Sequence, residues 1–283
     1  MKAVAIDLDG TALTNDGKFS KRLEQAIHNM HEKGILIFIA TGRSMKSLSS
    51  KLPKDLPVDG YVAASGVVVV AQGQVLRSST FKKETIEEVI SIAREQNVYY
   101  EVNTTNDGPF TFLQDKEYAL EDLLHPPEED VLAYETIGAS RSITDSNQWV
   151  DTIDLTDVIK LYFFSNYKDK IKKFYNTLDQ NSDNNTKYAL YQTAVHNSEI
   201  MVPGVDKGTG LTVLAQHFNI NLSDIHVFGD SMNDIPMFKV AGKSVAMKHA
   251  IEELKDLRDL SDDKTEFTNE EEGLAQYFEA HYL

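Results

Sequence analysis

The chain has 283 residues, of which 28 are Lys or Arg and 44 are Asp or Glu, and it contains no cysteine. The net charge of −16 disfavours nucleic acids and anionic membranes as main partners, and the lack of cysteine excludes disulfides and thiolate metal sites. No apolar run approaches the roughly 18 residues of a membrane-spanning helix, and no signal-peptide pattern precedes Asp7, so we expect a cytoplasmic protein.

The first part of the chain alternates buried strands with a helix. Residues 2–6, 35–40 and 61–64 are short apolar runs, typical of strands that are buried on both faces. Leu23, Ile27 and Met30 recur at helical spacing between the first two runs, and Gly34 is a stop signal. Strand, helix and strand with short connections predict a right-handed crossover and a parallel sheet.

The middle of the chain has a different pattern of strands and helices from the start, and the pattern of the start returns near the end. We expect an antiparallel sheet covered on one face by helices. Its predicted helices are 83–96 and 168–180, its predicted strands are 98–103, 110–114, 158–165, 187–192 and 198–202, and irregular polar sequence separates the second strand from the third. After it we expect helix 207–218, strands 225–228 and 244–247, and a last helix over 274–281.

The predicted fold class is therefore α/β with an inserted module. A Rossmann-like parallel-sheet core would comprise residues 1–82 and 202–283, and an α+β module would occupy 83–201. Polar and aromatic residues of the module suit contacts to a polar organic ligand, although most of the aromatic ones are predicted to be core. These residues are Tyr99, Tyr100, Glu101, Asn103, Tyr162, Tyr188 and Tyr191.

Acidic residues follow the predicted strands at the sheet edge where ligands bind in open parallel sheets. Asp7 and Asp9 are two residues apart, so both can project toward one side, and such a pair repels unless a cation or proton lies between its members. Together with Asp230 and Asp234 they would form an oxygen-only cluster, which favours Mg²⁺ over Zn²⁺. The alternative is an Asp-containing turn at 7–10 and two ordinary helix-start acids.

Three further positions suggest an anion site. Thr41 and Gly42 end the second strand, where a hydroxyl, close backbone approach and free amides can bind an anion, or where Thr41 is only a helix cap. Lys207 begins a predicted helix, where a cation opposes the helix dipole but is useful beside an acid cluster or anionic ligand. If the sheet is parallel, these residues and the acids converge on one crevice.

The order of these motifs resembles that of a known family. DLDGT (7–11), TGR (41–43), VDKGTGL (205–211) and GDSMND (229–234) resemble the four motifs of the haloacid dehalogenase superfamily of phosphatases, and the chain looks like its Cof-type subfamily. That subfamily carries an α+β cap between the second and third motifs, where the inserted module is expected here. The resemblance extends to EEEGLA (270–275) near the end.

The resemblance implies an Mg²⁺-dependent phosphatase that acts on small organic phosphomonoesters through an aspartyl-phosphate. Such substrates include sugar phosphates, flavin mononucleotide and pyridoxal phosphate. Asp7 would be the nucleophile, and Asp9 would be the general acid and then the base, a task that suits a carboxyl with a raised pKa. The expected partner is a small phosphate ester, and the chain would be a monomer or a weak homodimer.

The remaining roles implied by the resemblance concern phosphate and metal. Thr41, Gly42, Lys207 and Asn233 would bind the phosphoryl group, with Asn233 reaching phosphate or orienting Lys207. The expected metal ligands are Asp7, Asp230, Asp234 and the backbone carbonyl of Asp9. Separately from these roles, Arg43, Ser65 and Gly66 are candidate substrate contacts.

Two places depart from the subfamily pattern. Ser65-Gly66 stands where Asn-Gly is common, and Lys248-His249 stands where Gly-Asn is common, so no family role is transferred to these residues.

Three other functions are weighed against a phosphatase. The first is a phosphotransferase or phosphomutase acting on sugar phosphates, and the second is a signalling receiver. In a receiver the phosphorylated Asp lies well downstream of the acid pair, unlike here. The third is a non-catalytic module that binds phospho-ligands. The complete set of motif residues argues against the third, since a silent module has no chemical need for all of them.

Overall fold

The computed structural model describes residues 1–48, 50–105, 108–128, 131, 148–192, 194–253 and 259–283. The chain divides into two compact units, one formed by Met1–Ser78 with Val205–Leu283 and the other by Ser79–Gly204. The second unit is thus an insertion in the first, with limits a few residues from those expected. Of the irregular sequence expected in the module, residues 129–130 and 132–147 lie outside the described part of the chain.

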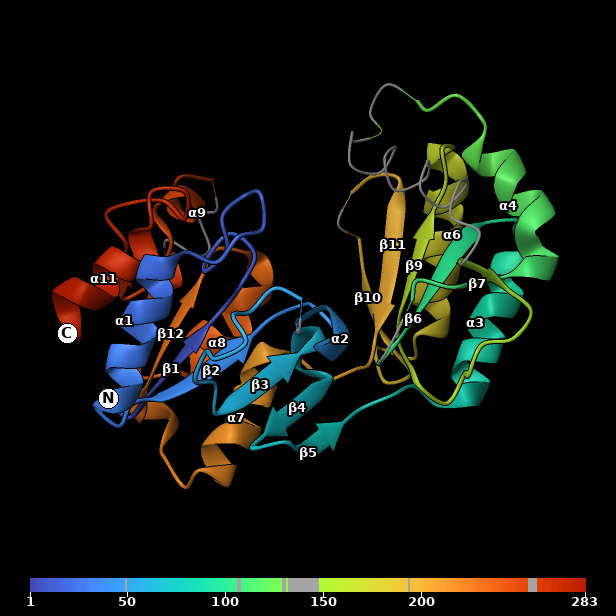
Figure 1. The fold of residues 1–283 in the computed structure, drawn as a ribbon. Coiled ribbons are helices and arrows are strands. Elements are labelled where there is room, and N and C mark those ends of the chain that lie inside the picture. The colour runs from blue at the N-terminus through green and yellow to red at the C-terminus, as the bar shows by residue number, and fades with distance from the viewer. Residues whose placement is uncertain (49, 106–107, 129–130, 132–147, 193, 254–258) are drawn as a thin grey trace. The chain divides into compact units, whose positions relative to one another are not determined.

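The first unit is built on an eight-stranded sheet (Figure 1). Six strands are parallel, and the two at one edge are antiparallel. In spatial order the strands are β14 (Asp263–Lys264), β13 (Lys243–Ala246), β12 (Ile225–Gly229), β1 (Ala3–Ile6), β2 (Leu36–Ala40), β3 (Gly60–Ala63), β4 (Val68–Ala71) and β5 (Gln74–Ser78). The expected α/β core is confirmed.

The hairpin of β4 and β5 was not predicted. It turns at Gln72 and Gly73, whose φ values of 50° and 76° match the two-residue turn that joins twisted antiparallel strands. The sequence signal was therefore present at Gln72-Gly73, although the valine run before it gives no alternation to mark the strand.

Helices cover both faces of this sheet. On one face α1 (Lys21–Glu32) packs against α11 (Gly273–His281), and on the other α7 (Lys207–His217) packs against α8 (Ile235–Val240) (Figure 1). Helix α1 begins where the Ser20 hydroxyl accepts from the Leu23 amide and buries its predicted apolar stripe. Two short helices, α2 (Met45–Leu48) and α9 (Lys248–Glu253), also belong to this unit.

Helix α7 lies unusually close to its neighbours because two of its first four residues are glycine. A Cβ on Gly208 would lie 2.4 Å from the Pro236 carbonyl oxygen, and a Cβ on Gly210 would lie 2.3 Å from a methyl of Val62. The KGTG sequence therefore lets the start of α7, and with it Lys207, approach the sheet and α8.

The second unit is an antiparallel sheet with two helices on one face. The sheet order is β10 (Ala189–Tyr191), β11 (Asn197–Met201), β9 (Val158–Phe164) and β6 (Tyr99–Thr104), and the two helices are α3 (Lys83–Glu95) and α6 (Lys168–Asn181). Phe163 packs on Phe174 of α6 with ring centroids 4.7 Å apart, which fixes the covered face. The expected antiparallel sheet is confirmed.

An additional helix, α4 (Lys116–Leu123), was not predicted and lies in sequence that we expected to be irregular. Only Thr111–Phe112 of the expected strand 110–114 is strand, β7, and it pairs with β8 (Trp149–Val150). Ala119 and Leu123 of α4 pack with Tyr99, Phe164 and Trp149 in one apolar cluster. This tertiary packing, rather than a strong local pattern, stabilises the helix.

The aromatic residues left open by the sequence divide into two groups. Tyr99, Tyr100 and Tyr188 are buried core residues, as the default interpretation predicts. By contrast, Tyr191 is 49% exposed. The half-buried residues of the sheet face opposite α3 and α6 are Glu101, Asn103, Lys160, Tyr162, Glu199 and Met201.

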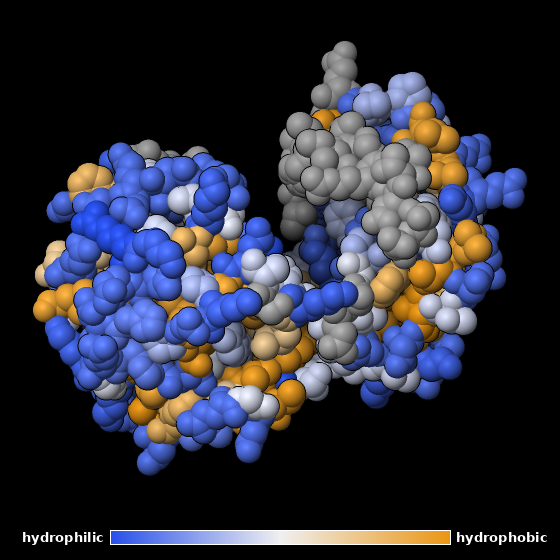
Figure 2. All heavy atoms as spheres, in the orientation of Figure 1, coloured by the Kyte–Doolittle hydropathy of each residue, from blue (hydrophilic) through white to orange (hydrophobic). Residues whose placement is uncertain are grey.

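The visible surface of the molecule is mostly hydrophilic, with apolar side chains dispersed over it (Figure 2). Among the described residues, no helix is both long and apolar enough to cross a membrane.

Replacing Gly208 with alanine should destabilise the first unit. The added methyl meets the backbone of α8, which cannot rotate away, so we expect a loss of about 1–3 kcal/mol in the free energy of unfolding. Urea denaturation followed by circular dichroism measures this loss. Gln216→Ala, at an exposed position of the same helix, is the matched control, and equal stability of Gly208→Ala and wild type would contradict the packing argument.

Candidate active site

The register of the parallel strands brings three motif residues to one edge of the sheet. Ile6 of β1 is level with Ile39 of β2 and Phe228 of β12. Asp7 follows β1 directly, while Thr41 and Asp230 follow the ends of β2 and β12. The sheet order alone therefore places residues from distant parts of the sequence side by side, as a parallel sheet predicts.

Lys207 lies at the centre of the site and is shared by two carboxylates. Its Nζ donates to Oδ1 of Asp7 and to Oδ1 of Asp234, both at 2.6 Å, and all three side chains are almost fully buried. Burial alone would lower the pKa of Lys207, but the charges of Asp234 and Asp7 raise it above its ordinary value. The lysine is therefore a fixed positive charge.

Asp234 organises the site and offers no oxygen without a donor. Its Oδ2 accepts from the backbone amides of Asp230 and Ser231, both at 2.9 Å, while Oδ1 accepts from Lys207. Asp234 therefore supports Lys207 and the loop that carries Asp230, and its predicted role as a metal ligand stays a prediction. The amide oxygen of Asn233 accepts from the Ser231 hydroxyl at 2.7 Å, and the prediction that Asn233 reaches phosphate or orients Lys207 stays a prediction.

The DGT part of the first motif holds Asp230. The Thr11 hydroxyl donates to Oδ1 of Asp230 at 2.7 Å. Gly10 has a φ of 79°, and a Cβ there would lie 2.2 Å from Oδ2 of Asp230, so only glycine leaves room for this carboxylate. Thr11 was quoted in the motif but given no role, and its hydroxyl next to an acid-rich loop was the available signal.

The carboxylates fit a divalent cation. One oxygen from each of Asp7, Asp230 and Asp234 lies within 4.8 Å of the others, and Lys207 is the cation hydrogen-bonded within this group. Burial raises the pKa of the Asp7 carboxyl well above its ordinary value, and the Asp234 charge raises it further, while Lys207 opposes both effects. Three acids against one lysine leave two negative charges in a buried place, and hard oxygen donors suit Mg²⁺.

Asp9 is set apart from this cluster. Its two oxygens accept from Nε and Nη2 of Arg43 at 2.7 and 2.6 Å, and its side chain is 55% exposed. The same arginine donates to the Ser47 hydroxyl at 3.1 Å. Arg43, a candidate substrate contact, therefore forms an ion pair with Asp9, the predicted general acid.

Three of the residues predicted to bind phosphate or substrate, Thr41, Ser65 and Asn233, lie close to Gly42. A Cβ at Gly42 would lie 3.5 Å from the Ser65 hydroxyl and 3.8 Å from the amide nitrogen of Asn233. Thr41 is fully buried, and its hydroxyl accepts from the Arg43 amide at 3.2 Å, which leaves its own proton available for an anion. The space left by the missing Cβ is thus bordered by hydroxyl and amide donors.

The loop at residues 64–66, which carries Ser65, has a left-handed backbone and lies against the start of α7. Ala64 and Ser65 both have positive φ, and Gly66 has a φ of 98° with its Cα directed so that a Cβ would lie 2.0 Å from the Asp206 carbonyl oxygen. Only glycine at position 66 allows the loop to approach α7 this closely. As a glycine, it could contact a substrate only through its backbone.

Two residues missed by the sequence analysis stabilise this arrangement. Asp206 caps α7 by accepting from the Thr209 amide at 2.7 Å, and the Thr209 hydroxyl accepts from the Asp206 amide in return. Arg77, on β5, donates to the Gly66 carbonyl and to the Thr209 hydroxyl, and so joins the loop to the helix. The Asp-x-x-Thr spacing could have revealed the cap, but no local signal marks Arg77.

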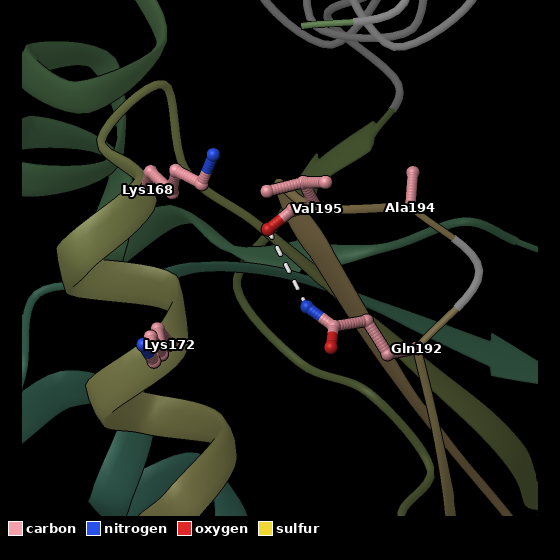
Figure 3. A pocket seen from close by; sticks show the side chains of 5 residues that line it. All are labelled: Lys168, Lys172, Gln192, Ala194 and Val195. Carbon is pink, nitrogen blue, oxygen red and sulfur yellow. Dashed lines mark hydrogen bonds between the residues drawn. The ribbon is translucent and has the colours of Figure 1, made fainter. Parts of the chain in front are cut away.

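A separate cavity of about 400 Å³ lies in the second unit (Figure 3). Its lining residues are Lys168, Lys172, Gln192, Ala194 and Val195. The two lysines belong to α6, and the amide of Gln192 donates to the carbonyl of Val195 at 3.4 Å. Among the residues that the structure describes, this lining has no carboxylate, so it lacks the acids that the cluster around Asp7 supplies.

The fold and the acid cluster together define a class. A chain with an α/β core, an aspartate directly after its first strand and a lysine shared between two acids matches the family model for haloacid dehalogenase-like hydrolases over residues 4–278. The chain belongs to this family, and it is a phosphomonoester hydrolase.

Relatives and a solved structure agree with this assignment. The 5-amino-6-(5-phospho-D-ribitylamino)uracil phosphatase of Bacillus subtilis is 31% identical, covering 99% of this chain and 97% of that protein. The HMP-PP phosphatase of Yersinia pseudotuberculosis is 27% identical, covering 100% and 95%. The structure of a haloacid dehalogenase-like hydrolase from B. subtilis matches with a TM-score of 0.70 at 27% identity and covers 100% of both chains.

Replacing Asp234 with asparagine should destabilise the first unit even though the shape is preserved. Asp234 accepts from Lys207 with one oxygen and from the loop amides with the other, whereas asparagine has only one acceptor oxygen. One of these buried donors would therefore lose its partner. We expect a loss of about 3 kcal/mol in the free energy of unfolding, measured by urea denaturation. Asp224→Asn, at an exposed surface pair, is the control, and unchanged stability of Asp234→Asn would show that this carboxylate does not hold the site together.

Proposed function

We propose that this chain is an Mg²⁺-dependent phosphatase that hydrolyses small organic phosphomonoesters through an aspartyl-phosphate on Asp7. The observation that carries the proposal is the buried contact of Lys207 with Asp7 and Asp234 beside Asp230. It combines a nucleophile, a fixed cation and a cluster with excess negative charge. The relative named for a phosphorylated ribitylaminouracil supports a small-molecule substrate.

Asp7 is the proposed nucleophile because only one of its oxygens is occupied. Oδ1 accepts from Lys207, while Oδ2 has no hydrogen-bond partner among the described residues. In the first step Oδ2 would attack phosphorus, the bond from phosphorus to the ester oxygen would break, and a proton from Asp9 would neutralise the leaving alkoxide. In the second step Asp9 would take a proton from water, whose oxygen displaces Asp7 and releases phosphate.

The position of Arg43 adds a condition to this mechanism. Both oxygens of Asp9 accept from Arg43, so at least one must be released before Asp9 can donate to a leaving oxygen. An anionic substrate offers the arginine an alternative partner of the same charge. Substrate binding would thereby free Asp9 at the moment when it is needed.

The transferred phosphoryl group would be held by groups that border the Gly42 space. Lys207 supplies the charge, and the hydroxyl of Thr41, the amide of Asn233 and the hydroxyl of Ser65 supply hydrogen bonds. Such donors are most effective where charge develops on the phosphoryl oxygens in the transition state.

Mg²⁺ would be held by Asp7 and Asp230, with the backbone carbonyl of Asp9 as a further ligand. When bound, the ion supplies the positive charge that lets a carboxylate and a phosphate approach each other. The excess of two negative charges in the cluster supports an ion of this charge.

The inserted unit, residues 83–201 by our sequence analysis, is proposed to be the cap that selects the leaving group. The sheet face opposite its helices carries polar residues suited to a hydroxyl-rich or heterocyclic alcohol, and its Lys160 and Glu199 pair at 2.8 Å.

Asp7→Asn should abolish phosphate release while the fold remains intact. The amide is a poor nucleophile, so we expect activity to fall by about a thousandfold or more. The assay follows phosphate release from a panel of sugar phosphates, flavin mononucleotide and pyridoxal phosphate, with Mg²⁺ and with a chelator. Asp16→Asn, at an exposed position, should behave as wild type. Substantial turnover by Asp7→Asn would rule out its role, and chelator-resistant turnover would rule out the metal.

Asp9→Asn should slow both half-reactions by about 10²–10⁴-fold, because proton transfer is lost in each. Burst and steady-state phases separate the two steps. Arg43→Met leaves the Asp9 carboxylate in place and is the matched variant, so it should raise KM more than it lowers kcat. If Asp9→Asn retained wild-type rates in both phases, another group would have to transfer the proton.

A further inference from the structure

His249 is a side chain beside the carboxylate cluster that the proposed mechanism does not use. Its Nε2 lies 3.7 Å from Oδ2 of Asp230, and the imidazole is partly buried. It stands in the segment that departs from the subfamily pattern. Its contact is with the oxygen of Asp230 that Thr11 does not hold.

The backbone around His249 is anchored to the strand that carries Asp230. The Met247 amide donates to the carbonyl of Gly229 at 3.0 Å, and the Lys248 amide donates to the hydroxyl of Thr265 at 3.0 Å. Gly229 directly precedes Asp230, so the imidazole and the carboxylate sit on two chain segments joined by a hydrogen bond. The fold therefore fixes the backbone from which the His249 side chain extends toward Asp230.

The surroundings of the ring favour one tautomer. Nδ1 of His249 is buried and has no hydrogen-bond partner among the described residues, whereas Nε2 faces a carboxylate. A proton on Nδ1 would be a buried donor without an acceptor, which is costly. A proton on Nε2 has Asp230 in front of it, so the neutral imidazole points a donor at this acid.

We propose that His249 is a positioning residue for Asp230, which holds Oδ2 through its Nε2–H when the site binds a divalent cation. Thr11 then fixes one oxygen of Asp230 and His249 the other, so the carboxylate is oriented from two sides. Partners of this kind keep a metal ligand in place and typically change metal affinity by about 10- to 100-fold. The inference rests on the proposed metal site.

The geometry argues against His249 as a direct ligand. The ligand atoms that lie within 4.8 Å of one another belong to Asp7, Asp230 and Asp234, and the imidazole is not a member of that group. An ion between Asp7 and Asp230 would therefore be reached by the histidine only through Asp230. Direct ligation becomes an outcome that the experiment can reject.

The test measures metal binding by the full chain without substrate. Isothermal titration with Mg²⁺ and with Mn²⁺ should give about 10- to 100-fold weaker binding for His249→Leu than for wild type. His249→Gln, which can again direct an N–H at Asp230, should restore most of the affinity. His31→Leu is the matched control, because Nε2 of His31 lies 3.5 Å from Asp59 in the same unit but outside the cluster. Its metal affinity should equal that of wild type.

Two further readouts separate positioning from direct ligation and from a general loss of stability. With chelator present, His249→Leu and wild type should have the same melting temperature, because the proposed role concerns the loaded site. Electron spin-echo spectra of the Mn²⁺ complex should show no directly bonded nitrogen, and a strong ¹⁴N coupling would overturn the positioning role. Unchanged affinity in His249→Leu would overturn the inference alone, whereas a wild-type chain that binds neither ion would overturn the proposed metal site itself.

Discussion

The buried lysine between two aspartates is the interaction on which the rest of the site depends. A lysine that is fully removed from water needs acidic partners, and Lys207 finds them in Asp7 and Asp234. For Lys207 to reach these acids, α7 must begin close to the sheet. This close approach requires the small residues Gly208 and Gly210, and Asp206 caps the start of the helix. The KGTG sequence and the preceding aspartate are consequences of this one requirement.

The same interaction makes the proposed binding of phosphate compatible with the acidic chain. Locally the lysine cannot balance three carboxylates, so the cluster can take a divalent cation; burial and then the Asp234 charge raise the pKa of Asp7. With such an ion and Lys207 together, the charge at the sheet edge would turn favourable for phosphate. The overall charge of −16 acts on large partners such as nucleic acids, whereas the charge balance at the acid cluster is set by its own few residues.

The parallel core and its edge residues could be predicted from the sequence because they depend on local signals. Apolar runs mark the buried strands, and strand ends mark Asp7, Thr41 and Asp230. Helix α4 and the link made by Arg77 could not be predicted, since both depend on packing partners far along the chain. The positions of Asp234 and Asn233 also needed the structure, because their sequence neighbourhood cannot tell an oxygen occupied by backbone amides from a free one.

Departures from the subfamily pattern fall on the border of the site and not at its centre. Ser65 lies against Gly42 on a loop whose left-handed backbone is imposed by the approach of Gly66 to α7, so the loop can change its side chain while it keeps its path. His249 lies against Asp230 on a segment tied to Gly229. In both places the backbone is fixed by contacts that do not involve the varied side chain. Variation there can adjust how phosphate or metal is held without disturbing Lys207 and its two acids.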